Sequence, residues 1–405
     1  MADTGRMLLT ADDVDRATDE LASVIRRTPT IASRVVSERS GAQVWLKCEN
    51  LQRTGSFKPR GAYLRISRLS AGERARGVVA ASAGNHAQGV AWAASELGIA
   101  SRVYMPVGAA LPKIAATKAY GAEVVLAGST VDEALVEAQR HAGTTGAALI
   151  HPFDHLDIVA GQSTVGVEIL EQIPDVSTIL VPLGGGGLLA GVAAAARLRR
   201  PEVEVIGVQA AQAAAWPTSL AEERPTPVAA MNTMADGIAV ATPGKVPFAH
   251  VSEFVDRIVT VSEEELSTAL LLMLERAKLV VEPAGAAAVA AAVSGRLALS
   301  GTVCVVLSGG NIDPLLLRHV TTHGLTAAGR FLTVTATVSD RPGGLVALLE
   351  LLRDLGASVL DVVHSRVADD LYLGEVQVTV SVETRGHDHQ HDVRRALADA
   401  GFLRD

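Results

Sequence analysis

The chain has 405 residues, of which 48% are hydrophobic and 20% are charged, and its net charge is -8. A chain of this length is too long to fold around one hydrophobic core of ordinary size, so two or three domains are expected. The composition is that of a globular protein. The negative charge and the lack of a basic stripe with interleaved aromatic residues argue against a nucleic-acid partner.

The opening segment MADTGRMLLTADDVDRATDEL carries acidic residues instead of a basic stretch and an apolar core, so it is not a secretory signal. No run of about 18 uninterrupted apolar residues occurs, and we expect no membrane span. The two cysteines, Cys48 and Cys304, are far apart in apolar, strand-like contexts. Two buried, reduced thiols in a cytoplasmic protein are therefore expected.

Strand-like runs alternate with alanine-rich helical stretches, among them 85–97 and 113–120, from about residue 42 to residue 310. This alternation indicates parallel sheets covered on both faces. So many strands predict an α/β fold with two sheets or two lobes, and a ligand cleft between them. The expected strands are Gln43–Lys47, Gly77–Ser82, Ser101–Met105, Glu123–Leu126, Ala148–His151, Thr178–Val181, Val205–Gln209 and Val303–Leu307.

The composition changes near residue 325, and residues 326–330 have the character of a linker. A β-α-β-β-α pattern follows, which predicts a small ferredoxin-like α/β domain over 331–405 with a final strand that is short or missing. Its expected elements are the strands Phe331–Val338, Ser358–Val367 and Leu371–Val382 and the helices Leu345–Leu355 and His387–Phe402.

Lys58 lies in the segment Thr54-Gly55-Ser56-Phe57-Lys58-Pro59-Arg60-Gly61. A lysine forms a Schiff base readily only when burial or a neighbouring cation lowers the pKa of its amine. Alone, such a lysine is more often a solvated residue at a helix start, so its meaning depends on the three motifs that follow.

Two turns stand between an apolar strand and a helix, where backbone N–H groups point outward at the positive end of the helix dipole. The first is Ser82-Ala83-Gly84-Asn85-His86, which is suited to the carboxylate of an amino acid, and its Asn85 amide can bond a phenolate oxygen. The second is Gly184–Gly187, where four glycines let the backbone surround a phosphate. It lacks a Walker lysine and the GxGxxG spacing, so a nucleotide loop fits poorly.

Ser308, in Ser308-Gly309-Gly310-Asn311, follows the strand Val303–Leu307 at the end where α/β sheets present functional groups. A neutral hydroxyl beside a pyridine nitrogen does not hold that nitrogen protonated, which favours prompt loss of a β-leaving group. Together the four motifs describe one pocket for pyridoxal 5′-phosphate (PLP) chemistry on an amino acid.

These motifs resemble those of the threonine/serine dehydratase family of PLP fold type II, over roughly residues 10 to 320. That fold has two open twisted sheets with flanking helices. The resemblance implies a catalytic domain over 1–325, with a small lobe at roughly 55–160 inserted in the large lobe, and makes Lys58 the catalytic Schiff-base lysine. It implies a cofactor-binding set of Phe57, Lys58, Asn85, Gly184, Gly185, Gly186, Gly187, Leu188, Gly237, Glu282 and Ser308. It implies a substrate-binding set of Ser82, Ala83, Gly84, Asn85, His86 and Asp236.

The implied reaction is α,β-elimination of L-threonine to 2-oxobutanoate and ammonia through an aminoacrylate, with Lys58 as the α-proton base. Dehydration of L-serine or threo-3-hydroxyaspartate is an alternative in the same fold, and residues around Pro152, Phe153 and Asp236 would decide between substrates. A β-replacement enzyme is a less favoured alternative, and a silent amino-acid sensor would have no need of all four motifs.

Two departures from relatives in that family narrow the prediction. Serine racemases carry a second serine where this chain has Ala83, which argues against racemisation. Some members bind a divalent cation through an acidic residue where this chain has Gln209, so we expect no metal.

The C-terminal segment, with Asp340-Arg341-Pro342-Gly343-Gly344-Leu345 between strand and helix, resembles an ACT-type regulatory domain. That resemblance implies an amino-acid effector, while a module serving only oligomerisation is the alternative. The histidines at 387, 389 and 391 are expected on a solvated helix face. The family resemblance implies a homotetramer or homodimer.

Overall fold

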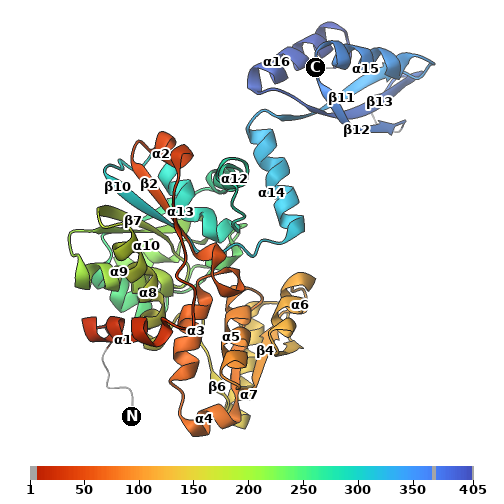
Figure 1. Ribbon diagram of the computed structural model, residues 1–405. Helices are drawn as coiled ribbons and strands as arrows, with labels where there is room; N and C mark the ends of the chain where they lie inside the picture. The colour runs from red at the N-terminus through yellow and green to blue at the C-terminus, as the bar shows by residue number, and fades with distance from the viewer. Residues whose placement is uncertain (1–6, 367–370, 404–405) are drawn as a thin grey trace. The chain divides into compact units, whose positions relative to one another are not determined.

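The computed structural model describes residues 7–366 and 371–403 (Figure 1). Contacts within the chain divide it into two compact units, Met1–Pro314 and Leu315–Asp405. In the described parts, no helix is long and apolar enough to cross a membrane.

The larger sheet of the first unit has six strands in the order β1-β2-β10-β7-β8-β9, all parallel except β1. Every residue of β10 is buried, as the continuous apolar run from Val303 to Leu307 predicts for a strand covered on both faces. The strands are β1 (Thr30–Ala32), β2 (Gln43–Cys48), β7 (Val176–Pro182), β8 (Glu204–Ala210), β9 (Arg257–Val261) and β10 (Thr302–Leu307).

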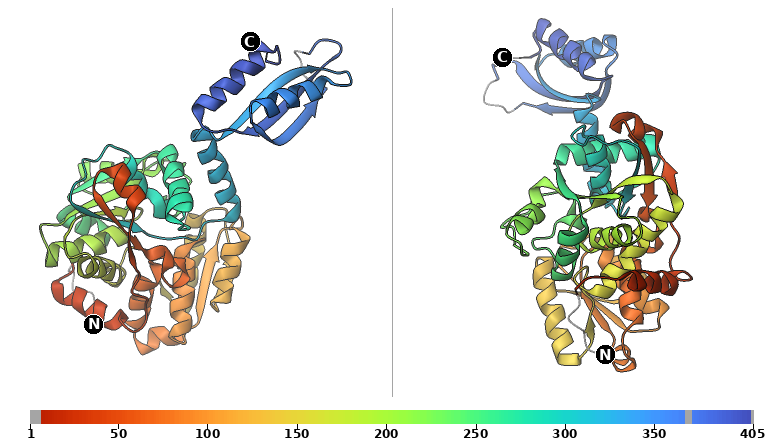
Figure 2. Two further views of the ribbon diagram at one scale, coloured as in Figure 1. Left: turned by 45° about the horizontal axis from the view of Figure 1, so that its top comes forward. Right: turned by 90° about the vertical axis from the view of Figure 1, so that its left-hand side faces the viewer.

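The second sheet of this unit has four parallel strands in the order β5-β4-β3-β6. Figure 2 shows this orange and yellow segment beside the green segment that carries much of the larger sheet. The two-sheet α/β fold confirms the predicted fold class. The strands are β3 (Val78–Ala81), β4 (Ser101–Met105), β5 (Glu123–Leu126) and β6 (Ala148–Leu149).

Two strands of the first unit were not expected, and two, β3 and β6, are shorter than expected. Strand β1 has only three residues, none of them buried, and β9 lies at the other edge of the sheet without an alternating pattern. Strand β6 ends at Leu149, because the ring of His151 accepts hydrogen bonds from the backbone N–H groups of Phe153 and Asp154 and forms a turn.

Alanine and glycine let the helices of the first unit pack closely. A Cβ at Gly161 of α8 would collide with Gly61 of α3, so these two helices touch through their backbones and hold the start of α3 in place. The helices are α1 (Ala11–Leu21), α2 (Arg34–Ser40), α3 (Lys58–Ser67), α4 (Ala71–Arg76), α5 (Asn85–Glu96), α6 (Leu111–Ala119), α7 (Val131–Thr145), α8 (Leu156–Gln172), α9 (Gly187–Arg199), α10 (Ala215–Ala221), α11 (Lys245–Phe254), α12 (Glu263–Leu272) and α13 (Pro283–Val293), with the short turns η1 (Glu49–Leu51), η2 (Arg53–Gly55), η3 (Ala211–Ala213), η4 (Asp236–Ile238) and η5 (Met273–Ala277).

The second unit has an antiparallel sheet in the order β11-β13-β12. Buried and less buried residues alternate along β11 and β13, so one face of the sheet forms a core with the helices. The predicted β-α-β-β-α order is confirmed, and no fourth strand joins this sheet in the described part of the chain. Its elements are α14 (Pro314–Ala327), which reaches into residues 326–330, β11 (Phe331–Ser339), α15 (Gly344–Asp354), β12 (Ser358–Ser365), β13 (Glu375–Glu383) and α16 (His387–Asp399).

Candidate active site

Lys58 is the first residue of α3 and follows Phe57, the N-cap of that helix. Its Nζ donates a hydrogen bond to the carbonyl oxygen of Pro152 at 3.1 Å and lies 5.1 Å from the centroid of the Phe57 ring. Burial lowers the pKa of Lys58 to about 8, although the negative charge of Glu282 opposes this shift. Lys58 is therefore partly neutral at physiological pH, as a nucleophile or proton acceptor requires.

The turn before Lys58 is joined to the loop that carries Ser308. The backbone N–H of Phe57 donates to the carbonyl oxygen of Ser308 at 3.1 Å, and Ser56 forms an isolated bridge with Gly309. Ser308 is only 4% exposed. These backbone contacts place the lysine motif and the serine motif together at the C-terminal end of β10.

Asn85, the first residue of α5, is joined to Glu282, which directly precedes α13. Asn85 Nδ2 donates to Glu282 Oε1 at 2.6 Å. Burial raises the pKa of Glu282 to about 7, and the charge of Asp236 adds to that effect, while the hydrogen bond from Asn85 and the charges of Lys113 and Lys58 oppose it. This buried carboxyl therefore changes protonation near neutral pH, which is unusual outside functional sites.

The turn Ser82–Gly84 leads into α5 and is half-buried, with Gly84 N–H donating to Ser82 Oγ at 3.1 Å. N–H groups in the first turn of a helix lack intrahelical acceptors, so this turn can receive an anion, and Ala83 contributes only its backbone. The His86 ring is directed elsewhere: its Nε2 bonds the carbonyl oxygen of Ile150 at 2.8 Å. Burial, with the nearby charge of Lys58, lowers the pKa of His86 to about 3, so this ring is neutral.

The glycine turn lies between the end of β7 and the start of α9, with Leu188 buried in the first turn of that helix. Gly186 has φ +99°, and a Cβ there would overlap the Trp216 ring, whose Nε1 donates to the carbonyl oxygen of Gly184 at 2.7 Å. A Cβ at Gly185 would overlap the ring of Phe153. The sequence therefore needs glycine for packing as well as for access to the backbone N–H groups at the start of α9.

Pro152 and Phe153 connect the lysine to the glycine turn. The Pro152 carbonyl holds the amine of Lys58, while the next side chain, Phe153, packs on Gly185 and Gly187. On the other side, Gly184 lies against Ile238, and a Cβ on the neighbouring Gly237 would lie 3.8 Å from Glu282 Oε1. Contacts thus connect the lysine, the glycine turn and Glu282, and their roles toward a cofactor stay a prediction.

Two residues that contact this site were not assigned from the sequence. Lys113, on α6, pairs with Asp236 through an Nζ–Oδ2 distance of 2.8 Å, and no motif marks this lysine. Asn311 donates to Asn85 Oδ1 at 2.8 Å. It stands in the Ser308–Asn311 motif, so its position in the sequence did carry a signal that was not used.

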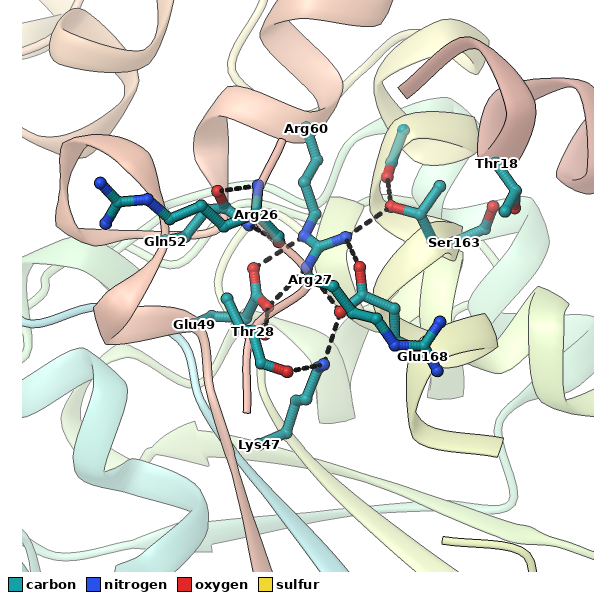
Figure 3. A network of polar contacts seen from close by, with 12 residues as sticks. Thr18, Arg26, Arg27, Thr28, Lys47, Glu49, Gln52, Arg60, Ser163 and Glu168 are labelled. Atoms are coloured by element: carbon teal, nitrogen blue, oxygen red, sulfur yellow. Dashed lines mark hydrogen bonds and ion pairs between the residues drawn. The ribbon is translucent and has the colours of Figure 1, made fainter. Parts of the chain in front are cut away.

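A buried ionic network supports α3 close to Lys58 (Figure 3). Arg60, fully buried in the first turn of α3, donates to both oxygens of Glu49 at 2.8 Å and to Glu168 Oε1 at 2.7 Å. Lys47 Nζ pairs with Glu168 Oε2 at 2.5 Å. The start of α3 is thereby anchored to η1 and α8 by charge-assisted hydrogen bonds.

The chemistry of these groups fits pyridoxal 5′-phosphate. Lys58 supplies a poised amine, the Gly184–Leu188 turn supplies N–H donors for a phosphate, and Asn85 and Ser308 supply polar side chains. Gln209, from which the absence of a metal was predicted, is buried, and its Oε1 accepts a hydrogen bond from the backbone N–H of Trp216 at 3.2 Å. Within residues 7–366 and 371–403, no cluster of three His, Cys, Asp or Glu side chains is placed to hold a metal.

The two-sheet α/β fold, the lysine at a helix start and the glycine turn define a PLP-dependent enzyme of fold type II. Residues 21–309 match the family described as pyridoxal-phosphate dependent enzymes, and the chain belongs to that family. The cofactor predicted from the sequence is thereby confirmed.

Individual relatives refine this placement. The chain is 45% identical over 396 residues to an L-threonine ammonia-lyase of Thermotoga maritima, with 98% of each chain covered. Among solved structures, the processed form of threonine deaminase isoform 2 from Solanum lycopersicum is 35% identical and superposes with a TM-score of 0.72, over 78% of this chain and 89% of that one. Maize serine racemase has a TM-score of 0.74 at 32% identity, over 78% of this chain and 98% of that one. The predicted resemblance to the threonine/serine dehydratase family is confirmed.

Proposed function

We propose that the chain catalyses the α,β-elimination of L-threonine to 2-oxobutanoate and ammonia. The observation that carries this proposal is the Lys58 amine, with a pKa near 8, positioned by Pro152 in one site with the glycine turn and Asn85. Relatives named L-threonine ammonia-lyase that cover nearly the whole chain support it.

When bound, pyridoxal 5′-phosphate supplies an electron-withdrawing ring that acidifies the α-proton of an attached amino acid. Lys58 would hold the cofactor and, once released, its neutral amine would accept the α-proton. The N–H groups at the start of α9 would hold the phosphate, and Phe57 would lie near the ring. Ser308 would offer a neutral hydroxyl to the ring nitrogen, which favours elimination over long-lived charge on the carbon.

The substrate carboxylate would be received by the turn Ser82–Asn85 through its backbone N–H groups and the Ser82 hydroxyl. Helix α5 packs on the start of α3, since a Cβ at Gly89 would lie 3.1 Å from Lys58 Cβ, so a substrate held by this turn would lie near Lys58. Asp236, across the site, is held by Lys113 and would border the substrate side chain.

The decisive experiment measures 2-oxo acid release by the purified protein with L-threonine, L-serine and threo-3-hydroxyaspartate in parallel. Fast release of 2-oxobutanoate from L-threonine supports the proposal, whereas higher kcat/KM for either other substrate assigns the alternative dehydratase. Lys58→Ala must abolish both turnover and the visible absorbance of the bound cofactor. Lys118→Ala, at an exposed lysine of α6, is the matched control and must retain both. Bound cofactor without elimination from any substrate would favour a β-replacement reaction.

We also propose a division into a catalytic domain over 1–325, a linker over 326–330 and an ACT-like regulatory domain over 331–405. A cavity of about 340 Å³ in the second unit is lined by Asp340, Arg341 and Arg366, so it offers both charges that an amino-acid effector needs. Titration of the enzyme with amino acids, measuring 2-oxo acid release, tests this regulatory role. Arg366→Ala should remove any effect while leaving the unregulated rate unchanged.

A homotetramer or homodimer is the proposed assembly. Strand β12 lies at the edge of its sheet and exposes Val359, Leu360, Val362 and Val363, which is a surface that a second copy can cover. Light scattering of the protein and of a Val363→Lys variant would detect such an assembly.

A further inference from the structure

The side-chain amide nitrogen of Asn311 donates two hydrogen bonds. Its Nδ2 donates to the carbonyl oxygen of Thr54 at 2.6 Å and to Asn85 Oδ1 at 2.8 Å. A backbone carbonyl can only accept hydrogen bonds, so the Thr54 carbonyl determines which end of the Asn311 amide faces it. Asn85 must then turn its own oxygen to Asn311 and its nitrogen to Glu282, at 2.6 Å.

We propose that Asn311 is a positioning residue that fixes the amide orientation of Asn85 and the turn before Lys58. This inference rests on the proposed function, because it concerns the same site. Nothing in the roles assigned above to Ser308 or to the substrate turn requires Asn311.

The orientation of Asn85 matters because its amide has one donor end and one acceptor end. One N–H of Asn85 donates to Glu282 Oε1, and the second remains for an acceptor in the site, such as the phenolic oxygen of the cofactor. In the reversed orientation the Asn85 oxygen would face the Glu282 carboxylate and that phenolic oxygen. The contact with the phenolic oxygen would then be repulsive, and so would the contact with Glu282 whenever its carboxyl is ionised.

The local backbone is shaped around Asn311. Thr54 has φ +60°, which is rare for a β-branched residue, and its carbonyl is one of the two acceptors of Asn311. Gly55 has φ +73°, and a Cβ there would overlap Asn311 Oδ1. A glycine and a left-handed threonine therefore allow this asparagine to reach both partners.

The test compares Asn311→Asp, Asn311→Ala and wild type. Aspartate has nearly the same shape but no donor, and it can be accommodated because Asn311 borders a cavity of about 440 Å³. The matched control is Asn232→Asp, which makes the same charge change at an exposed asparagine. For each protein the visible absorbance of the bound cofactor is titrated with pH, kcat and KM for L-threonine are measured, and the melting temperature is recorded.

We expect Asn311→Asp to lower kcat by about 100-fold, since two donor contacts become acceptor-to-acceptor contacts. The pH at which the cofactor absorbance changes should also shift, because Asn85 no longer presents a fixed N–H to the phenolic oxygen. Asn311→Ala should lose about 10-fold in kcat, since Asn85 is then free but not reversed. Asn232→Asp should match wild type in all readouts.

An unchanged absorbance titration in Asn311→Asp, with only a lower melting temperature, would overturn the proposal in favour of a structural role. Equal losses in the Asp and Ala variants would overturn it as well. If the Asp variant does not fold, Asn311→Ser must show a smaller shift in the same direction. Absence of elimination in wild type would defeat the proposed function alone, because the absorbance titration reports on Asn85 without turnover.

Discussion

Replacing Arg60 by methionine tests whether the buried ionic network holds the helix that carries Lys58. Arg60 is fully buried and donates to both oxygens of Glu49 at 2.8 Å and to Glu168 at 2.7 Å (Figure 3). Methionine has a similar length and no donors, so the variant keeps much of the packing and removes the charge. Two carboxylates are then left close together with only Lys47 to neutralise them.

Removing one partner of a buried ion pair lowers the free energy of unfolding by ~3–5 kcal/mol. Because Arg60→Met leaves two carboxylates without this partner, we expect a loss near ~5 kcal/mol. At about 2 °C per kcal/mol for a large domain, the melting temperature should fall by about 10 °C. The partly exposed pair Arg102–Glu123 is the control, and Arg102→Met should cost no more than about 1 kcal/mol.

The deficit should also depend on pH. In wild type burial opposes ionisation of Glu168, but the charges and hydrogen bonds of Arg60 and Lys47 outweigh it and lower its pKa. Without Arg60, burial, the largest effect, is opposed by Lys47 alone, and we expect the pKa of Glu168 in the folded state to rise above that in the unfolded chain. A carboxyl with a raised folded pKa is tolerated at low pH and destabilises as the pH rises through that value. The difference in melting temperature, measured by calorimetry, must therefore be larger at pH 8 than at pH 5. An equal difference at both values, or one no larger than that of Arg102→Met, would refute this reasoning.

Three further outcomes are expected. Gly186→Ala, at φ +99°, should cost roughly 2 kcal/mol or more and weaken cofactor retention during dialysis, and full retention would contradict the role of the glycine turn. The apoprotein should bind the cofactor faster as the pH rises through about 8, because only the neutral amine of Lys58 reacts. Glu282→Gln removes the negative charge that raises the pKa of Lys58, so this increase in rate should occur at lower pH. Lys113→Met leaves the charge of Asp236 uncompensated, so the pKa of Glu282 should rise above about 7 and the acid limb of kcat/KM should move to higher pH. Adding Asp236→Asn to the Lys113→Met variant should reverse that shift. If the acid limb of kcat/KM does not move in Lys113→Met, Glu282 is not the group that titrates there.

The parts of the candidate site that could be predicted from the sequence are those whose residues lie in contiguous segments. The glycine turn and the lysine segment each combine a chemical group with the local signals of a strand end or a helix start, so their type and place could be inferred. Pairs joined only by the fold had no such signal. The sequence indicates only that Arg60 is a second cation close to Lys58. Its contact with Glu168 results from the packing of α3 on α8.

His86 shows why a motif predicts a turn better than it predicts the side chains within it. The turn Ser82–His86 was expected to bind a carboxylate, and that binding stays a prediction. In a helix, consecutive side chains are rotated by about 100°, because one turn takes 3.6 residues. Asn85 therefore faces Glu282 in the site, while the next residue, His86, faces the carbonyl of Ile150 in the protein interior. The backbone N–H of His86 still lies in the first turn of α5, where an anion would bind. At position 86, binding of a carboxylate would therefore depend on the backbone and would tolerate any side chain that fills the buried space.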